Sequence, residues 1–213
     1  MFSRTLNIKN LDVSQNSLTS LPTNLATLSE LKYLHCDKNL LHSDSISVIT
    51  QLSRLEIFSA GCNKLGIAST NPMNQAGGFP ELPPNVRQLK LPCNSFLTIP
   101  SQIVSKNLIR LEKIDLSGNH LTSIPPDISN LLELLEINLD NNHIASLPES
   151  MGFLSKLKIL SLQNNKIRVT STKFSPDYPQ PIPALVFTST LLIDFKLKGN
   201  PLTNTQLVRV FTQ

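Results

Sequence analysis

Histidine can bind a metal ion and cysteine can bind a metal ion or form a disulfide, and both residues are scarce in this sequence. The chain contains four His and three Cys among 213 residues. His120 and His143 each directly follow an Asn, whereas Cys62 and Cys93 each directly precede one. If the chain is built of similar repeats and each pair occupies equivalent positions in neighbouring repeats, the two imidazoles could share a metal ion and the two thiols could form a disulfide.

Neither pair by itself predicts a site. A metal ion needs further ligands beside the two histidines, so we interpret His120 and His143 as solvent-exposed side chains at a rim. Cys62 and Cys93 are expected to stay reduced, because three cysteines without other secretory features favour a reducing compartment. Cys36 replaces an inward-facing Leu and is expected to be a small core residue. We predict no metal and no cofactor.

Ser59 and His35 are the nearest approach to a catalytic arrangement, because they occupy the same position in neighbouring units. A serine nucleophile needs a base within hydrogen-bond reach, an orienting third group and a pocket that excludes water. The sequence indicates an open surface without a pocket or oxyanion donors. We therefore predict that the chain is not an enzyme.

A sequence motif that occurs eight times along the chain determines where these side chains lie. Segments of the form L-x-x-L-x-L-x-x-N-x-L recur along the chain, and one of them consists of Leu111, Ile114, Leu116, Asn119 and Leu121. Two apolar residues face inward from a short strand, and the Asn offers a carbonyl and an amide to backbone groups where the chain turns away. Stacked units predict one continuous aliphatic core and an internal ladder made of Asn16, Asn39, Asn63, Asn94, Asn119, Asn142, Asn165 and Asn200.

The predicted fold is an α/β repeat solenoid of about eight repeats that forms a single domain over residues 1–213. A parallel β-sheet is expected on the concave face, with short helices, 3-10 turns and loops on the convex face. Steps such as Leu147-Pro148 begin several convex arms, where Pro needs no N–H. The strands are expected near residues 10–14, 33–37, 57–61, 88–92, 113–117, 136–140, 159–163 and 194–198.

The ladder asparagines follow one another at a nearly constant spacing, and two intervals break this regularity. The intervals from Asn63 to Asn94 and from Asn165 to Asn200 are clearly longer than the others. The additional residues lie in 66–84 and in 169–191, which are rich in Pro, Gly, Ser, Thr and Asn. This composition predicts irregular insertions rather than helices.

Composition and the two ends of the chain limit the class of partner. The formal charge of +4 and the pI near 9.0 arise from basic residues scattered along the chain, whereas nucleic-acid binding needs them gathered on one face. No apolar run is long enough to span a membrane, and the N-terminus lacks a signal peptide, so we expect a cytoplasmic protein. Residues 203–211 are expected to form a capping helix, and the missing cap before the first repeat indicates truncation or a docking partner.

The full repeating pattern, LP-x-x-(I/L)-x-x-L-x-x-L-x-x-L-x-L-x-x-N-x-(I/L), resembles the typical intracellular leucine-rich repeats. Residues 111–125, 134–148 and 157–167 carry the likeness best, and residues 198–202 (KGNPL) look like a terminal repeat of such proteins. The likeness is to the Ras-group class, which includes scaffold proteins of Ras–MAP-kinase signalling and their plant relatives. It implies a leucine-rich-repeat horseshoe that binds a protein, although the same repeat serves many unrelated partners.

The concave face is where a partner is expected to bind. Neighbouring strands lie about 4.8 Å apart, so equivalent residues form columns, and these columns mix both charges in a way that suits a protein better than a polyanion. Tyr33 and Ile57 adjoin in one column as candidate anchors, unless they serve only strand propensity. The predicted contact residues are Tyr33, His35, Ile57, Ser59, Lys90, Lys113, Asp115 and Glu136.

Two functions fit this surface. The first is a protein–protein interaction module or scaffold in intracellular signalling. The second is the sensor or substrate-recognition part of a larger enzyme or ubiquitin-ligase-type protein. Both need a protein partner, whose identity the sequence leaves open together with the oligomeric state.

Overall fold

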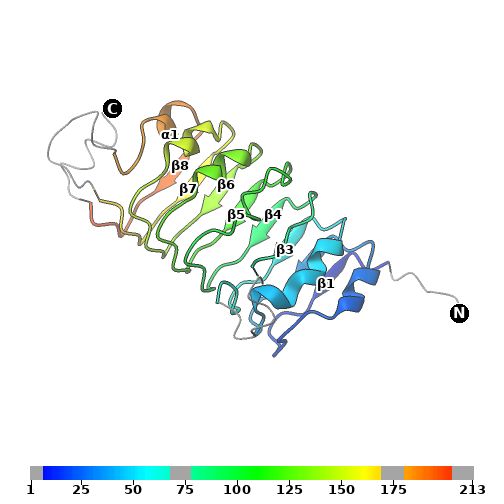
Figure 1. Cartoon of the computed structure of the whole chain (residues 1–213). Coiled ribbons are helices and arrows are strands. Elements are labelled where there is room, and N and C mark those ends of the chain that lie inside the picture. Colours follow the sequence, from blue (N-terminus) through cyan, green and yellow to red (C-terminus); the bar gives the residue numbers. More distant parts are fainter. Residues whose placement is uncertain (1–6, 68–77, 169–179, 203–213) are drawn as a thin grey trace, which may run out of the picture.

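The protein is built on one open parallel sheet. The computed structural model describes residues 7–67, 78–168 and 180–202. Within them, eight strands pair side by side in chain order (Figure 1). This arrangement confirms the predicted solenoid. The strands are β1 (Asn10–Asp12), β2 (Tyr33–His35), β3 (Ile57–Ser59), β4 (Gln88–Lys90), β5 (Lys113–Asp115), β6 (Glu136–Asn138), β7 (Ile159–Ser161) and β8 (Asp194–Lys196).

The strands pair in register, so equivalent residues of successive repeats lie next to one another. The middle residue of each strand faces the core, where Leu34, Phe58 and Leu89 are fully buried. In the outermost strands the corresponding residues, Leu11 and Phe195, are only partly buried. All of these side chains pack into a single apolar cluster. Each repeat therefore completes the core of its neighbours.

Each strand begins at the expected residue but spans three residues rather than five. The ladder hydrogen bonds continue beyond the strand: Val13 N donates to His35 O and Gln15 N donates to Asp37 O, both at 2.8 Å. Gln15 then adopts a left-handed φ of 58°, which turns the chain away from the sheet. The same position is left-handed in the seven later repeats, at Lys38, Cys62, Cys93, Gly118, Asn141, Asn164 and Gly199.

An Asn side chain follows each of these turns, and in all but the first repeat it binds backbone groups of two repeats. Asn142 Oδ1 accepts the Leu121 N–H at 2.9 Å, and its amide lies 3.0 Å from Leu116 O and 3.1 Å from Leu139 O. Asn16, in the first repeat, is exposed and bonds to carbonyls of its own repeat. Bonds to the preceding repeat are also made by Asn39, Asn63, Asn94, Asn119, Asn165 and Asn200.

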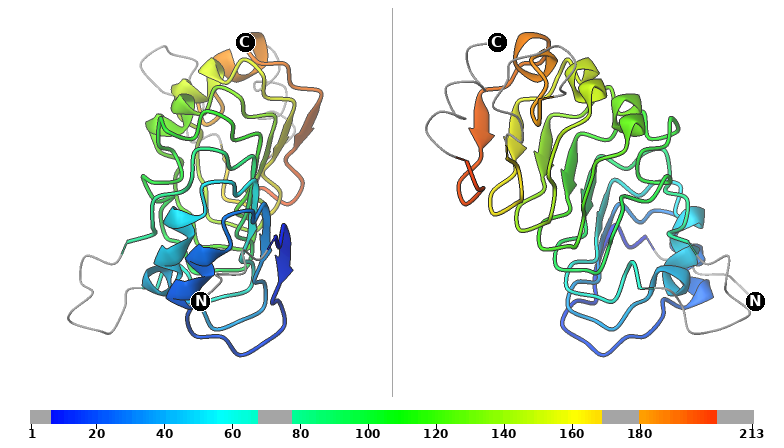
Figure 2. Two further views of the ribbon diagram at one scale, coloured as in Figure 1. Left: turned by 90° about the vertical axis from the view of Figure 1, so that its right-hand side faces the viewer. Right: turned by 60° about the vertical axis from the view of Figure 1, so that its left-hand side comes forward.

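The opposite, convex side carries short 3-10 helices, as predicted (Figure 2). They are η1 (Thr23–Thr27), η2 (Ser43–Gln51), η4 (Pro126–Asn130) and η5 (Glu149–Phe153). The longest of these is η2, with nine residues. A proline with φ between −68° and −73° precedes each of the other three, as Pro22, Pro125 and Pro148.

The expectation of irregular structure over 169–191 is wrong for its last part. Residues Leu185–Thr188 form the short α-helix α1, and Val186 is completely buried. The helix packs against η5, where a Cβ added to Gly152 would lie 2.5 Å from Leu185 Cβ. Apolar burial against the convex side therefore outweighs the loop-like composition of the segment.

Parts of both insertions and both chain ends lie outside the described residues. These parts are 1–6, 68–77, 169–179 and 203–213, so the capping helix expected at 203–211 lies among them. The described remainder of the first insertion contributes to the core. Phe79 is buried, and its ring packs edge to face on Phe96 with centroids 5.8 Å apart.

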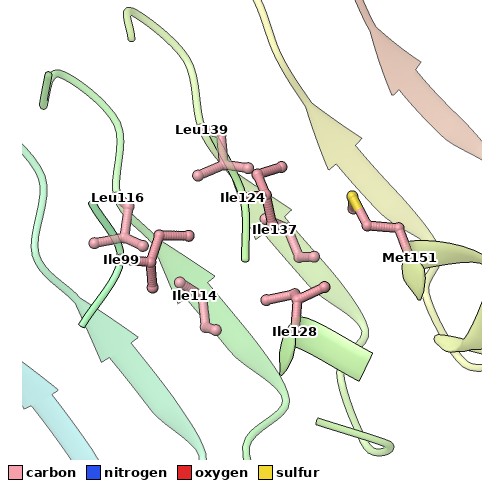
Figure 3. A pocket seen from close by; sticks show the side chains of 8 residues that line it. All are labelled: Ile99, Ile114, Leu116, Ile124, Ile128, Ile137, Leu139 and Met151. Carbon is pink, nitrogen blue, oxygen red and sulfur yellow. The ribbon is translucent and has the colours of Figure 1, made fainter. Parts of the chain in front are cut away.

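The core also contains a small void between the middle repeats (Figure 3). Its volume is about 10 Å³, and only apolar side chains line it. A water molecule needs about that much space and at least two polar partners, which this lining does not offer. The void is therefore a packing imperfection and not a ligand site. Its lining consists of Ile99, Ile114, Leu116, Ile124, Ile128, Ile137, Leu139 and Met151.

Candidate functional site

The outer residues of the strands lie on the concave side, where all but Ser59 of β3 and Ser161 of β7 are at least partly exposed. Tyr33 pairs in register with Ile57, and both are partly exposed. An aromatic and an aliphatic side chain thus adjoin across β2 and β3. His35 is also partly exposed, at the other end of β2. These three residues form what we call the N-terminal patch.

Ser59 is the predicted contact residue that the structure removes from this surface. It is only 5% exposed, and its hydroxyl donates to both carboxylate oxygens of Asp37, at 2.7 and 2.8 Å. The hydroxyl is therefore committed to Asp37 rather than to His35. The hydrogen bond between Ser59 and His35 that the catalytic alternative requires is therefore not formed.

The middle of the concave face is a charged hollow. Lys90 and Lys113 are exposed, and Asp115 and Glu136 are partly exposed. Lys113 Nζ lies 2.8 Å from Glu136 Oε2, which joins β5 to β6. The hollow has a volume of about 240 Å³, and its lining consists of Gln88, Leu89, Lys90, Lys113, Ile114, Asp115, Glu136 and Asn138. Lys90, Lys113, Asp115 and Glu136 are thus brought together.

A second hollow, of about 410 Å³, lies beyond the ends of the first strands. Asp12, Asp37 and Lys38 are its charged residues. Hydrogen bonds from the Ser14 side chain and then from the Ser14 backbone lower the pKa of Asp12, against a smaller opposing effect of burial. The other residues that line it are Ser14, Gln15, Gly61, Cys62 and Pro92.

A carboxylate network between repeats is a feature that the sequence reasoning missed. Asp37 accepts the Ser59 hydroxyl from the next repeat, and Asp140 accepts the Ser161 hydroxyl at 2.7 Å in the same way. The sequence contains a signal for this network. In both cases an Asp lies two positions before the ladder Asn, and a Ser is the last residue of the strand in the next repeat. These carboxylates are bound within the fold, so they support the shape of the face rather than offering free ligands.

The histidine and cysteine pairs are both brought together. The rings of His120 and His143 stack with centroids 5.9 Å apart and planes inclined by 19°. Cys62 and Cys93 are exposed free thiols, and Cys36 is buried as predicted. In the described part of the chain, His, Cys, Asp and Glu do not gather in any group of three or more that could hold a metal ion.

One family match and one structural match agree with the repeat geometry described above. A family model described as a leucine rich repeat matches residues 84–144, the repeats of β4, β5 and β6. The structure of an internalin from Listeria monocytogenes matches with a TM-score of 0.69 over 93% of this chain and 50% of its own, at 19% sequence identity. The chain contains leucine-rich repeats and has the leucine-rich-repeat fold.

Two relatives match this leucine-rich-repeat chain over little more than half its length. The Ras guanine nucleotide exchange factor V of Dictyostelium discoideum is 31% identical over 123 residues, which are 58% of this chain and 5% of that protein. Tsukushi of mouse is 30% identical over 126 residues, 59% of this chain and 34% of that protein. The chain thus matches only a small part of either relative.

Leucine-rich-repeat domains generally act as protein–protein interaction modules, which is the general class predicted for this chain. Among the described residues, no helix has the length and apolar character needed to cross a membrane.

Proposed function

We propose that this leucine-rich-repeat chain holds a protein partner on its concave face, as a cytoplasmic interaction module or scaffold in signalling. The observation that carries the proposal is the adjacency of Tyr33 and Ile57 at the surface of paired strands. Partly exposed aromatic and aliphatic side chains surrounded by polar groups are the usual anchors of protein interfaces.

The charged hollow supplies the second part of the proposed contact. Lys90, Lys113, Asp115 and Glu136 carry both signs of charge within one hollow. Such an arrangement selects a partner whose charges alternate in the complementary order, and it disfavours a uniformly charged polyanion. We therefore propose one extended contact from the N-terminal patch to the hollow.

A second candidate function is the recognition part of a longer protein with a sensor, enzyme or ligase activity elsewhere. The observation that favours it is the match to the Ras guanine nucleotide exchange factor V, since the matched residues are only 5% of that protein. In that case the same concave face selects the protein on which the rest of the molecule acts.

The test compares partners recovered from the native cell. The double variant Tyr33→Ala/Ile57→Asp should reduce the yield of the specific partner about tenfold or more relative to the unaltered protein, as expected for the loss of anchor residues. Phe153→Asp is the matched control, because this side chain is 64% exposed on the convex side, in η5. An unchanged partner set for a double variant that still unfolds at the same temperature would overturn the proposal.

A charge reversal separates recognition from stability in the hollow. The double variant Lys113→Glu/Glu136→Lys keeps an ion pair between β5 and β6 but exchanges its signs. Partner recovery should fall although the melting temperature stays within a few degrees, because surface ion pairs contribute little stability. Equal recovery would place the contact elsewhere. Isolation of the protein only as part of a longer polypeptide would favour the second candidate function.

A further inference from the structure

Cys62 and Cys93 occupy the same left-handed turn position in adjacent repeats, with φ values of 53° and 52°. Cys62 N donates to Pro92 O at 2.8 Å, so the sheet hydrogen bonds hold the two turns side by side. Paired strands lie about 4.8 Å apart, which is within the Cα separation of about 4.4 to 6.8 Å that a disulfide requires. The backbone is thus already placed for a bridge.

The Cys93 side chain lies near enough to Cys62 to raise the pKa of the Cys62 thiol. Cys93 Sγ itself lies toward Gly118, where an added Cβ would be 3.2 Å from it, and rotation about the Cα–Cβ bond of Cys93 would bring its sulfur to Cys62. Two repeats further along, the same column contains another side-chain bridge, since Asn164 Nδ2 donates to Asn141 Oδ1 at 2.8 Å. Side chains of this column can therefore bond across a repeat boundary.

We propose that Cys62 and Cys93 are a thiol-oxidation site, at which a small-molecule disulfide of the glutathione class converts them into a bridge between the third and fourth repeats. This inference needs no protein partner, and in a reducing compartment it describes a bridge that forms only when the surroundings become oxidising. The third cysteine takes no part, because Cys36 is fully buried and its thiol donates to Ser59 O at 3.2 Å.

The exchange proceeds in two displacements. One cysteine loses its proton, and its thiolate attacks a sulfur of the small disulfide, which forms a mixed disulfide and releases one small thiolate. The second cysteine then loses its proton and attacks the protein sulfur of the mixed disulfide, which releases the other small thiolate. The two protons end on the two released thiols. The protein cysteines are oxidised by two electrons, and the small disulfide is reduced by two.

The surroundings make this reaction slow at neutral pH. Burial and then the Cys93 thiol raise the pKa of Cys62, and Asp37 adds to this effect, whereas Lys38 opposes it. Because only the thiolate attacks, a raised pKa lowers the reactive fraction of Cys62 at neutral pH.

The bridge would tie β3 to β4 across the first of the two long intervals in the ladder, between Asn63 and Asn94. In a solenoid, stability is a sum over repeats and the interfaces between neighbours. A covalent bond across one interface suppresses opening at that interface in particular. We expect the melting temperature to rise by roughly 5 to 10 °C, with slower amide hydrogen exchange in β3 and β4.

The experiment uses the full chain, first reduced and then equilibrated with mixtures of oxidised and reduced glutathione. The intact mass should fall by two hydrogens, and protease digestion should release one linked peptide that contains Cys62 and Cys93. Oxidation should be about tenfold faster at pH 8 than at pH 7, as the thiolate fraction rises. Cys36→Ala should form the same bridge, whereas Cys93→Ser should stop at a mixed disulfide on Cys62.

Two results would overturn the proposal. One is that the natural chain keeps both thiols, or accumulates only mixed disulfides, under strongly oxidising glutathione. The other is that the linked peptide contains Cys36, which would mean that oxidation requires unfolding. A bridge that forms without raising the melting temperature would contradict the stabilising role.

Discussion

The Asp37 carboxylate holds the Ser59 hydroxyl with both of its oxygens, at 2.7 and 2.8 Å, across the boundary between two repeats. The same carboxylate accepts the Gly61 N–H at 2.6 Å. A counterpart lies nearer the other end of the sheet, where Asp140 accepts the Ser161 hydroxyl and the Gln163 N–H. An Asp therefore acts as an anchor between repeats at two places beside the concave face.

Replacing Asp37 with Ala should destabilise the fold by about 2 kcal/mol, because the Ser59 hydroxyl and the Gly61 N–H lose a charged acceptor. Urea unfolding followed by circular dichroism measures the change. Asp127→Ala, at an exposed residue of η4, should change stability by less than about 0.5 kcal/mol. Equal losses in the two variants would mean that the network between repeats contributes nothing of its own.

The ladder asparagines should differ in importance according to whether they bind one repeat or two. Asn142→Ala leaves the Leu121 N–H unpaired in the core and removes one of the two amide donors of the Leu116 carbonyl, which keeps only its bond from Asn119, and it should cost about 2 to 4 kcal/mol. Asn16→Ala removes only exposed bonds within the first repeat and should cost less than about 1 kcal/mol. Unfolding in urea ranks the two variants, and the reverse order would contradict the ladder interpretation.

The Asp12 carboxyl group should titrate below its ordinary pKa of 3.8, chiefly because the Ser14 side chain donates a hydrogen bond to its charged form. In Ser14→Ala the pKa should rise but remain lowered, since Ser14 N still donates at 2.9 Å. A group with a lowered folded pKa stabilises the fold above its unfolded pKa, and this contribution is lost as the pH falls through the folded pKa. NMR titration of the carboxyl carbon measures the change, and Ser17→Ala should leave the midpoint unaltered.

Met151 contributes to the core through its volume, since it is completely buried beside the void of about 10 Å³. Met151→Leu preserves that volume and should cost less than about 1.5 kcal/mol. Met151→Ala enlarges the void and should cost about 2 to 5 kcal/mol. Phe153→Ala, on the exposed side of the same helix η5, is the matched control and should change the free energy of unfolding by about 0.5 kcal/mol or less. Similar costs at both positions would mean that burial does not govern these effects.

The repeat itself was predictable because one residue type marks it in every copy. The Asn positions and the inward pair of apolar residues specify the register of the whole sheet, since each strand must present the same face to the core. The strand starts followed directly from this pattern. Their ends did not, because the left-handed turn is occupied by residues as different as Gln15, Lys38 and Asn141 and thus has no composition signal.

The site was less predictable than the fold because exposure depends on neighbours that are distant in the sequence. Ser59 looks like a solvent-facing strand residue until Asp37, from the preceding repeat, is placed against it. Helix α1 was missed for a similar reason, since its apolar residues become helical by packing against η5. In contrast, Tyr33 and Ile57 adjoin as the column positions require, because strand register alone determines that relationship.

Each strand pairs with the strands of the adjacent repeats. The described convex helices that contact one another, such as η4 and η5, also belong to adjacent repeats. A single repeat duplicated or deleted in the gene would therefore meet the same kind of neighbour on both sides. Such a change lengthens or shortens the concave surface without a new core having to evolve. The size of the partner that the surface can bind then depends on the number of repeats. The surface residues of each repeat can change independently of that number.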